Sequence, residues 1–268
     1  MGKFDGVLLA SDFDDTLYGL DRQVCPRNRK ALDYFIAQGG RFTVATGRAH
    51  TTFAPYVHLA PINAPVVLSN GSAIYDFQQE RFLVQTLLDP RAPDDMAALT
   101  AAIPEIGFEA YHGEDIYVYN FNAVTAGHMK KVGTTYTQCP IAQMPTPWGK
   151  VILQQEHDVL LRARAWLLEH CPERYEAVFS NRYYLELTDR GSTKGSMVAR
   201  LADMLGIARE NIYCAGDNQN DISMLQLSAI PFAPANCAPE VRQWGARVLC
   251  HCNDGLMGDI VEILDQRY

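Results

Sequence analysis

Acidic side chains follow a short apolar stretch near the start of this 268-residue chain. Asp12 and Asp14 are two positions apart, and side chains with this spacing share one side of an extended backbone. Two carboxylates about 4 Å apart repel by about 4 kcal/mol at an effective dielectric constant of about 20. The pair therefore requires a nearby cation, a shared proton or ample water. Considered alone, the cluster is explained equally well by a solvated turn or a helix cap.

A calcium-binding loop is another interpretation of these acidic residues. Such a loop needs a glycine at its sharp turn and, at its end, a glutamate that binds the ion through both oxygens. Leu17 and Gln23 occupy these two positions, so the sequence does not support a calcium loop.

Two further clusters offer groups that could bind an anion. Thr46 and Gly47 follow an apolar stretch, and a hydroxyl beside a backbone without a side chain can cradle a phosphate. A helix N-cap explains Thr46 equally well. Lys194 begins a predicted helix, where its charge opposes the helix dipole, so it needs either an anionic partner or solvent.

The last polar cluster contains Asp217, Asn220 and Asp221. Carboxylate and amide oxygens are ligands that suit a hard divalent cation. A helix cap accounts for Asp217 alone, but it does not require the other two residues. The cluster therefore predicts a cation site.

The apolar stretches in front of these clusters predict β-strands. The expected strands lie at 7–11, 41–45, 66–69, 211–214 and 229–232. Helical periodicity at 26–38, 197–205 and 260–264 alternates with them, which indicates a parallel sheet with helices on both faces. An open sheet of this kind binds its ligands at the carboxyl ends of its strands, so the four clusters are expected to meet there.

The middle of the chain has a different pattern. It predicts a hairpin at 73–84, helices at 94–102 and 158–170, and strands at 116–119, 151–153 and 183–187. A stretch of about 100 residues is long enough for a small α+β domain. We therefore predict a core of residues 1–84 and 188–268, into which residues 85–187 are inserted as a second domain.

The four clusters, in this order, resemble the four motifs of the haloacid dehalogenase superfamily. The matching segments are DFDDTL at 12–17, ATGR at 45–48, Lys194-Gly195 and GDNQND at 216–221, with support from SNGS at 69–72, NDGL at 253–256 and FAPANCAPEVRQWGA at 232–246. The position of the insertion is similar to that of the type-B cap in the Cof-like branch, which includes many sugar-phosphate phosphatases. The resemblance thus implies a Rossmann-like core with an inserted α+β cap that determines substrate specificity.

The sequence departs from the family pattern at Asp15, where most members of that family carry glycine. The alternation of side chains along an extended backbone predicts that Asp15 points away from the pocket. We therefore expect this change to have little effect on the chemistry.

The resemblance also assigns catalytic roles. Asp12 is expected to attack phosphorus and form an aspartyl-phosphate, and Asp14 to act as general acid and then general base. Mg²⁺ is the implied cofactor, held by the Asp12 carboxylate, the Asp14 carbonyl and Asp217. The implied activity is hydrolysis of a small phosphorylated metabolite.

Other positions are implied to bind the phosphate or to support the residues that do. Thr46, Gly47, Lys194 and Asn220 are expected to contact phosphate oxygens. Asp221 is expected to lie behind them, where it orients Lys194 or the metal ligands.

Several neighbouring residues are weaker candidates for the substrate side. Arg48 either meets the phosphate or packs toward the cap, and His50 lies two positions beyond it. Asn181, Arg182 and Tyr183 in the inserted segment are candidates to line the side that contacts the leaving group.

The composition excludes several classes of function. A formal net charge of −8 and an isoelectric point near 5.3 disfavour nucleic acid and anionic membranes as partners. No apolar run approaches the roughly 20 residues that span a bilayer. Neither a dinucleotide-binding or Walker loop nor a GxSxG elbow occurs, which argues against nucleotide-cofactor enzymes and serine hydrolases.

Cysteine usage indicates the compartment. Seven cysteines are scattered along the chain, and the Cys250-His251-Cys252 segment lacks a second pair at zinc spacing. We expect reduced thiols in a cytoplasmic protein, present as a monomer or a small homo-oligomer.

The functional prediction is a magnesium-dependent phosphatase acting on sugar phosphates or similar small metabolites. Two alternatives stay open at this point. A phosphomutase of the same superfamily would transfer the phosphoryl group to another hydroxyl. A non-catalytic phospho-acceptor, as in the receiver domains of response regulators, would hold the group without turnover.

Overall fold

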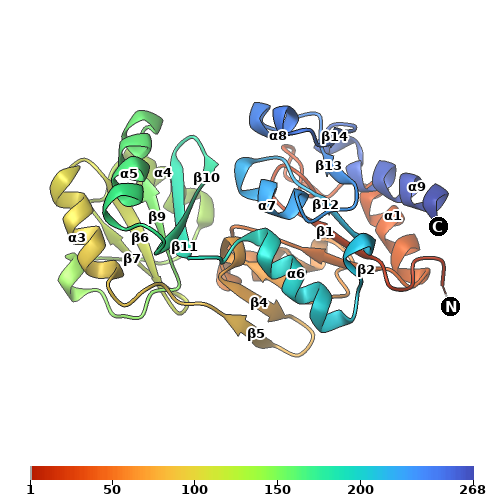
Figure 1. Cartoon of the computed structure of the whole chain (residues 1–268), viewed down its shortest axis with the longest axis horizontal. Helices are drawn as coiled ribbons and strands as arrows, with labels where there is room; N and C mark the ends of the chain where they lie inside the picture. Colours follow the sequence, from red (N-terminus) through yellow and green to blue (C-terminus); the bar gives the residue numbers. More distant parts are fainter. Residues whose placement is uncertain (1) are drawn as a thin grey trace.

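The chain forms two bodies, each built around its own β-sheet (Figure 1). The computed structural model describes residues 2–268. The body that contains both termini is called the core below, and the other is called the cap. The chain passes between them twice, after β5 (Arg81–Gln85) and after β11 (Tyr184–Asp189).

The central sheet of the core is entirely parallel. Its strands, in spatial order, are β14 (Arg247–Val248), β13 (Pro231–Ala233), β12 (Ile212–Ala215), β1 (Leu8–Ser11) and β2 (Arg41–Val44). The innermost strands, β12 and β1, contain only buried residues. This agrees with the continuous apolar runs that identified these strands, because a parallel sheet is covered on both faces.

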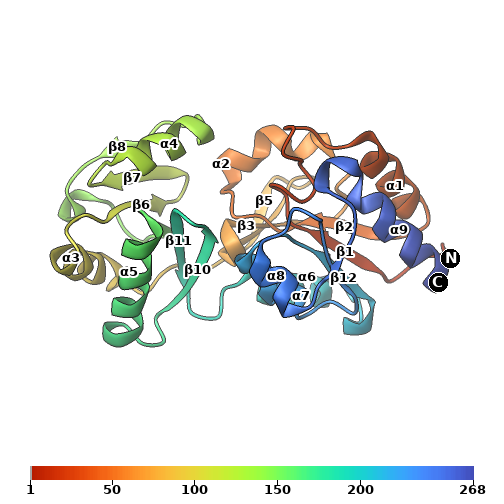
Figure 2. The same ribbon diagram turned by 90° about the horizontal axis from the view of Figure 1, so that it is seen from above.

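Helices cover both faces of the central sheet (Figure 2). One face packs on α1 (Pro26–Ala37) and α9 (Leu256–Arg267), and the other on α6 (Lys194–Leu205), α7 (Ile222–Leu225) and α8 (Pro239–Trp244). Successive side chains of β1 point to opposite faces, so Leu9 joins the first layer whereas Leu8 and Ala10 join the second.

A small antiparallel sheet extends the core beyond β2. It contains β3 (Val66–Leu68), β4 (Ala73–Asp76) and β5. Val67 of β3 forms a parallel bridge with Ala45, directly after β2. The short helix α2 (His50–Phe53) lies between β2 and β3 in the sequence.

The cap sheet is antiparallel except for one edge pair. Its order is β10 (Tyr175–Asn181), β11, β9 (Lys150–Gln154), β6 (Gly107–His112), β7 (Asp115–Tyr119) and β8 (Thr137–Gln138). The apolar face packs on α3 (Ala92–Ala102) and α5 (His157–His170). The opposite face carries α4 (Ala123–Val132) and turns toward the core (Figure 2).

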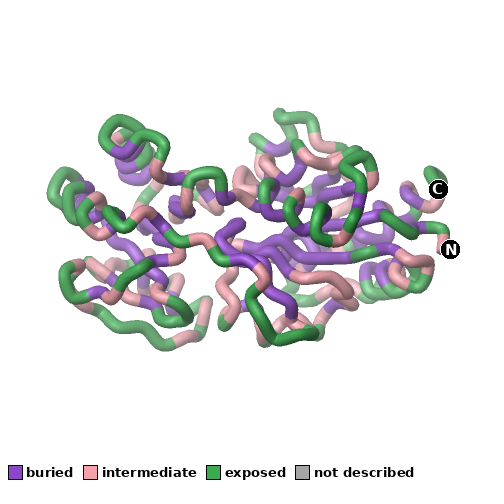
Figure 3. Tube along the Cα trace, turned by 60° about the horizontal axis from the view of Figure 1, so that its bottom comes forward, coloured by how far each residue is buried: buried purple, intermediate pink, exposed green. Residues whose placement is uncertain are grey.

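The predicted fold class, a parallel α/β core with an inserted α+β unit, is confirmed. Figure 3 shows buried backbone in the interior of both bodies and exposed segments at their edges. Domain boundaries at 85 and 187 stay a prediction. None of the helices within residues 2–268 has the length and apolarity that crossing a membrane requires.

Candidate active site

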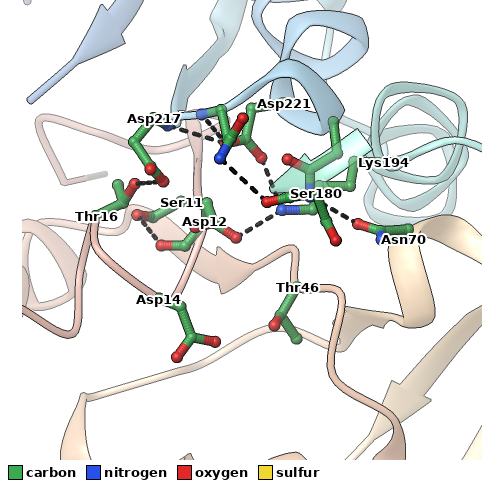
Figure 4. Close-up of polar contacts among 12 residues, drawn as sticks. Ser11, Asp12, Asp14, Thr16, Thr46, Asn70, Ser180, Lys194, Asp217 and Asp221 are labelled. Carbon is green, nitrogen blue, oxygen red and sulfur yellow. Dashed lines mark hydrogen bonds and ion pairs between the residues drawn. The ribbon is translucent and has the colours of Figure 1, made fainter. Parts of the chain in front are cut away.

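The four polar clusters meet at the carboxyl ends of adjacent strands (Figure 4). Asp12 follows β1, Thr46 lies just beyond β2, and Asp217 follows β12. The backbone N–H of Asp12 donates to the carbonyl of Ala215 over 2.8 Å, which extends the pairing of β1 and β12 by one residue. The parallel sheet therefore places residues from distant parts of the sequence around one point.

Lys194 joins the first and last clusters. Its ammonium group is fully buried and lies 2.5 Å from Oδ1 of Asp12 and 2.7 Å from Oδ1 of Asp221. The other oxygen of Asp221 accepts bonds from the backbone N–H groups of Asp217 and Asn218, at 2.9 and 3.0 Å. Both oxygens of Asp221 are thus occupied by protein donors, which suits a residue that positions Lys194.

Two glycines permit these contacts. A β-carbon at position 216 would lie 2.4 Å from Cβ of Asp221, so only glycine lets this acid approach the loop. Gly71 has a φ of +102°, and a β-carbon there would lie 2.3 Å from the carbonyl oxygen of Thr193, which caps α6 immediately before Lys194. The glycines of the GDNQND and SNGS segments thus set the place of the ammonium group.

Asp12, Asp217 and Asp221 form the single group of three or more potential metal ligands found within residues 2–268. One oxygen from each lies within 4.8 Å of the others. The hydroxyl of Thr16 donates to Oδ1 of Asp217 over 2.8 Å. Three carboxylates around the single ammonium of Lys194 leave an excess of negative charge, and hard oxygen donors suit a divalent cation.

The pKa values of Asp12 and Asp217 are raised by burial and by the excess of negative charge. Burial raises the pKa of Asp12 well above its usual value, although Lys194 opposes this effect. Burial, together with the charge of Asp221, raises the pKa of Asp217 to about 7. The pKa of Lys194 is raised as well, because the charges of Asp12 and Asp221 outweigh its burial.

Asp217→Asn is expected to change stability in opposite directions with and without a divalent metal. Between the ordinary pKa of 3.8 and the raised value of about 7, the folded protein binds a proton that the unfolded chain has lost. The stability that this group contributes is therefore complete below this range and is lost as the pH rises through it. Asparagine does not titrate, so in EDTA above pH 7 the variant should be more stable than the wild type.

Added magnesium should reverse that order, because the variant lacks one of the expected ligands of the ion. Urea unfolding well below and well above pH 7, with EDTA or magnesium, measures both effects. A variant that magnesium stabilises as strongly as the wild type would remove Asp217 from the metal site.

Asp14 points away from the network around Lys194 (Figure 4). Arg48 binds both of its oxygens, with Nε and a terminal guanidinium nitrogen each at 2.7 Å. Burial alone would raise the pKa of Asp14, but the hydrogen bonds and charge of Arg48 lower it. The guanidinium also lies 4.3 Å from the ring centroid of Tyr56. Arg48, left open between two roles by the sequence, therefore holds Asp14 in its ionised form.

The residues expected to bind phosphate lie next to Asp12 and Lys194. Thr46 is buried, and its hydroxyl oxygen accepts the backbone N–H of Arg48 at 3.1 Å. Asn220 donates through its amide to Oδ1 of Asn70 over 2.9 Å. In the described part of the chain, Nδ2 of Asn70 and Oδ1 of Asn220 are buried without a partner. Buried polar atoms without partners indicate a place for a polar ligand or water.

A cavity of about 180 Å³ lies between the core and the cap. The core contributes mainly acidic and backbone groups, and the cap contributes aromatic and charged side chains. Residues that line it are Asp12, Asp14, Asp15, Gly47, Arg48, Ala49, Thr52, Asp217, Asn218 and Asn220 from the core, and Tyr111, His128, Lys131, Val132, Lys150, Ile152, Ser180, Asn181, Tyr184 and Glu186 from the cap.

Direct bonds hold the cap over the core. Lys150 donates to the carbonyl of Gly47 over 2.8 Å, and its ammonium is also 3.3 Å from the carboxylate of Glu186. Asn218 donates to the carbonyl of Ser180 over 3.0 Å. These contacts hold the cap beside the cavity around Asp12, which stays partly open.

Three expectations about nearby residues need correction. Asp15 lines the cavity, because its φ of +61° breaks the extended geometry on which side-chain alternation depends. Glycine adopts that left-handed conformation without strain, whereas most other residues do not. His50 does not line the cavity, since its ring packs on Tyr75 and its Nδ1 lies 2.7 Å from Glu114 of the cap. Arg182 is exposed and lies 3.8 Å from Glu156.

Among the three neighbours in the cap turn, only Asn181 lines the cavity. The seven cysteines are free thiols. Cys250 and Cys252 take part in no group of potential metal ligands in the described structure.

Some residues of the cavity were not foreseen. Lys150 and Glu186 form a buried pair across neighbouring strands of the cap. Their one signal in the sequence is a charged residue at a predicted strand: Glu186 lies inside 183–187, and Lys150 directly precedes 151–153. Asn70, which accepts a hydrogen bond from Asn220 but does not line the cavity, was visible only through the SNGS segment. His128 lines the cavity and lies on a helix that was not predicted.

Comparisons with known proteins agree with this geometry. The family model of haloacid dehalogenase-like hydrolases matches residues 9–256. A 5-amino-6-(5-phospho-D-ribitylamino)uracil phosphatase of Bacillus subtilis is 26% identical over 262 residues, covering 88% of this chain and 90% of that protein. A pyridoxal phosphate phosphatase of Escherichia coli is 24% identical over 255 residues, with the same two coverages of 88% and 90%.

Solved structures share the whole architecture. A phosphatase of this superfamily from Bacteroides thetaiotaomicron superposes with a TM-score of 0.84 at 16% identity, over 98% of this chain and 96% of that one. A sugar phosphatase of subclass IIB superposes with a TM-score of 0.83 at 17% identity, over 97% and 99% of the two chains. At these identities the similarity shows the fold.

The match of the family model extends through both halves of the core and the whole cap. The superfamily predicted from four short motifs is therefore confirmed, together with the predicted enzyme class, a phosphatase. The chain belongs to the haloacid dehalogenase-like hydrolases, in the Cof-like phosphatase branch.

Proposed function

We propose that this protein is a magnesium-dependent phosphatase that hydrolyses small phosphorylated metabolites, such as sugar phosphates, through a phosphoryl group carried by Asp12. The observation that supports this most strongly is the meeting of Asp12, Lys194 and Asp217 beside a small cavity between the core and the cap. Relatives named for pyridoxal phosphate and a phosphoribitylamino-uracil support the class of substrate.

Asp12 supplies the nucleophile. Its Oδ1 is held by Lys194, so the carboxylate keeps one orientation while its other oxygen is available for attack on phosphorus. The P–O bond to the substrate breaks as the Asp–O–P bond forms. Water then attacks the acyl phosphate, which restores Asp12 and releases inorganic phosphate.

Asp14 supplies the proton transfers. The ionised form that Arg48 stabilises is ready to accept a proton from the attacking water in the second step. In the first step Asp14 must carry a proton to the leaving oxygen, so it has to take up that proton and leave Arg48. Arg48 is therefore a positioning residue: Asp14 acts as general base while it is bound to Arg48, and as general acid after it has left Arg48.

The cation site fits magnesium. The oxygens of Asp12 and Asp217, with the carbonyl of Asp14, would hold the ion, which would neutralise the repulsion between the carboxylates and the phosphate dianion. Asp221 stays outside this set, because protein donors occupy both of its oxygens.

Phosphate oxygens would be bound by residues around the same point. We assign this role to Lys194, the hydroxyl of Thr46, the backbone of Gly47 and Asn220. Each of these groups can donate a proton, and Thr46 and Lys194 are buried, which strengthens such bonds. We propose no nucleic-acid or membrane partner and a cytoplasmic location, in line with the net charge of −8.

Hydrolysis of para-nitrophenyl phosphate tests the proposal. Purified protein with magnesium should release inorganic phosphate over many turnovers, and EDTA should abolish the release. Stable phosphorylation without turnover would instead identify a phospho-acceptor domain. Transfer of the phosphoryl group between sugar hydroxyls, without release of phosphate, would identify a mutase.

A further inference from the structure

The cap sheet presents a polar face to the core. Side chains of β6 alternate, so Phe108 and Ala110 join the apolar layer under α3 and α5. Glu109 lies between them and points the other way, with no exposed surface. A buried carboxylate is costly unless donors surround it, so its partners indicate what the site is built for.

Three donors converge on Glu109. His128 of α4 approaches through Nδ1 at 2.7 Å, the hydroxyl of Tyr111 donates over 2.9 Å, and the amide of Gln154 donates to the oxygen that faces His128. Burial and the charge of Glu109 raise the pKa of Tyr111, so this phenol keeps its proton. Nδ1 of His128 and the amide nitrogen of Gln154 are 3.0 Å apart because both donate to one oxygen.

This arrangement fixes the imidazole of His128. With Nδ1–H donating to the carboxylate, the other ring nitrogen, Nε2, is directed elsewhere. The side chain of His128 is 12% exposed and lines the cavity, and Nε2 bonds to none of the residues from 2 to 268. Tyr184 packs on the ring with centroids 4.7 Å apart, which fixes its tilt.

We propose that His128, held by Glu109, determines which leaving groups the enzyme accepts by hydrogen bonding through Nε2 to a hydroxyl of the leaving group. The inference rests on the proposed phosphatase function. A hydroxyl group can pair with Nε2 in either state of the ring, because it donates to the neutral form and accepts from the charged form.

The other polar groups on the cap side favour the same kind of leaving group. The ammonium of Lys150 is a donor, the carboxylate of Glu186 is an acceptor, and Asn181 is both. Hydroxyl groups also both donate and accept, so a hydroxylated chain or ring satisfies this mixture. A leaving group with apolar carbons at this place would leave Nε2 of His128 without a partner, whereas Lys150 and Glu186 would still pair with each other.

Two substitutions of His128 separate recognition from structure. In His128→Asn the amide nitrogen stands where Nδ1 was, so the bond to Glu109 is kept and the atom facing the cavity is lost. In His128→Gln the amide reaches the position of Nε2, so the atom facing the cavity is kept and the bond to Glu109 is lost. If His128 only stabilised Glu109, His128→Asn would keep the preference for a hydroxylated leaving group and His128→Gln would lose it.

The probes are erythritol 4-phosphate and n-butyl phosphate, which share a carbon skeleton and differ in their hydroxyl groups. The wild type should prefer the first in kcat/KM. His128→Asn should lower kcat/KM for erythritol 4-phosphate by roughly tenfold and change that for n-butyl phosphate by less than about twofold, whereas His128→Gln should keep most of the preference. Urea unfolding should show that His128→Asn is the more stable variant.

Para-nitrophenyl phosphate serves as the reference substrate, because its leaving group carries no free hydroxyl. If His128→Asn hydrolyses this compound and still prefers erythritol 4-phosphate to n-butyl phosphate as strongly as the wild type does, the inference is overturned. The phosphatase function would then be intact. A wild type with no preference for erythritol 4-phosphate would also overturn the inference and leave the phosphatase function intact. Absence of phosphate release from all three compounds would overturn the proposed function itself, and the inference with it.

Discussion

Asp12→Asn is expected to lower the rate of phosphate release by at least about 10⁴-fold, the order of loss seen when a nucleophile is removed. Asparagine has the shape of aspartate, but its amide neither attacks phosphorus nor attracts the cation. The loss should appear in kcat with magnesium saturating, because the missing group acts in the chemical step. A variant that retains a tenth of wild-type activity would exclude Asp12 as the nucleophile.

The fold of this variant should be intact. Asp12, Asp217 and Asp221 place three carboxylates around Lys194, so removing one charge relieves repulsion and leaves the Lys194–Asp221 pair in place. In metal-free buffer the free energy of unfolding should therefore be equal to or above that of the wild type.

Asp15→Asn is a matched control on the same loop. It makes the same change in a carboxylate that lines the cavity but is not bonded to Lys194. Asparagine also tolerates the left-handed backbone at this position. This variant should keep most of the activity, so an equal loss in both variants would point to the overall charge of the loop as the cause.

Lys194→Met should destabilise the protein by about 3–5 kcal/mol, the cost of removing one partner from a buried ion pair. The ammonium is the only group of the described structure that neutralises both Asp12 and Asp221, and all three side chains are buried. Urea unfolding in metal-free buffer measures the effect. Phosphate release should be lost as well, since the nucleophile and the phosphate would lose their shared cation.

A double-mutant cycle separates this electrostatic effect from loss of packing. In the Asp12→Asn background the same Lys194→Met change leaves one fewer buried charge without a partner, so the destabilisation should be smaller. Equal destabilisation in both backgrounds would mean that the Asp12–Lys194 contact contributes nothing to stability.

The core could be predicted from sequence because its signals are local. The expected strand at 7–11 became β1 at Leu8–Ser11, and the expected helix at 26–38 became α1 at Pro26–Ala37. Buried parallel strands are continuous apolar runs, and each is followed by the polar residues that the sheet brings together. A site at strand ends is therefore visible in the sequence when the strands themselves are.

The cap was harder to predict because its polar residues lie inside secondary structure. β6, α4 and β10 were not predicted. Glu109 interrupts the apolar pattern of β6, and α4 contains Gly127, which weakens the helical signal. The pairing of Glu109 with His128 depends on how a strand and a helix pack, so neither residue alone indicates it.

Backbone conformation accounts for the remaining difference near the nucleophile. Alternation of side chains placed Asp14 correctly in the cavity but failed one residue later, at Asp15. The alternation rule holds only while the backbone is extended. The bond between Asp14 and Arg48 joins side chains 34 positions apart and became visible only with the fold.

The central claim is that a phosphoryl group is carried by Asp12, and trapping that group tests it most directly. Asp14→Asn protein, mixed with magnesium and para-nitrophenyl phosphate, should accumulate the acyl phosphate. The nitrophenolate leaving group needs little help from an acid, whereas the hydrolytic water has lost its base. Borohydride should then convert residue 12 to homoserine, which mass spectrometry of the peptide would detect. An unmodified residue 12 would contradict the account, whether the reduced residue is found elsewhere in the chain or nowhere.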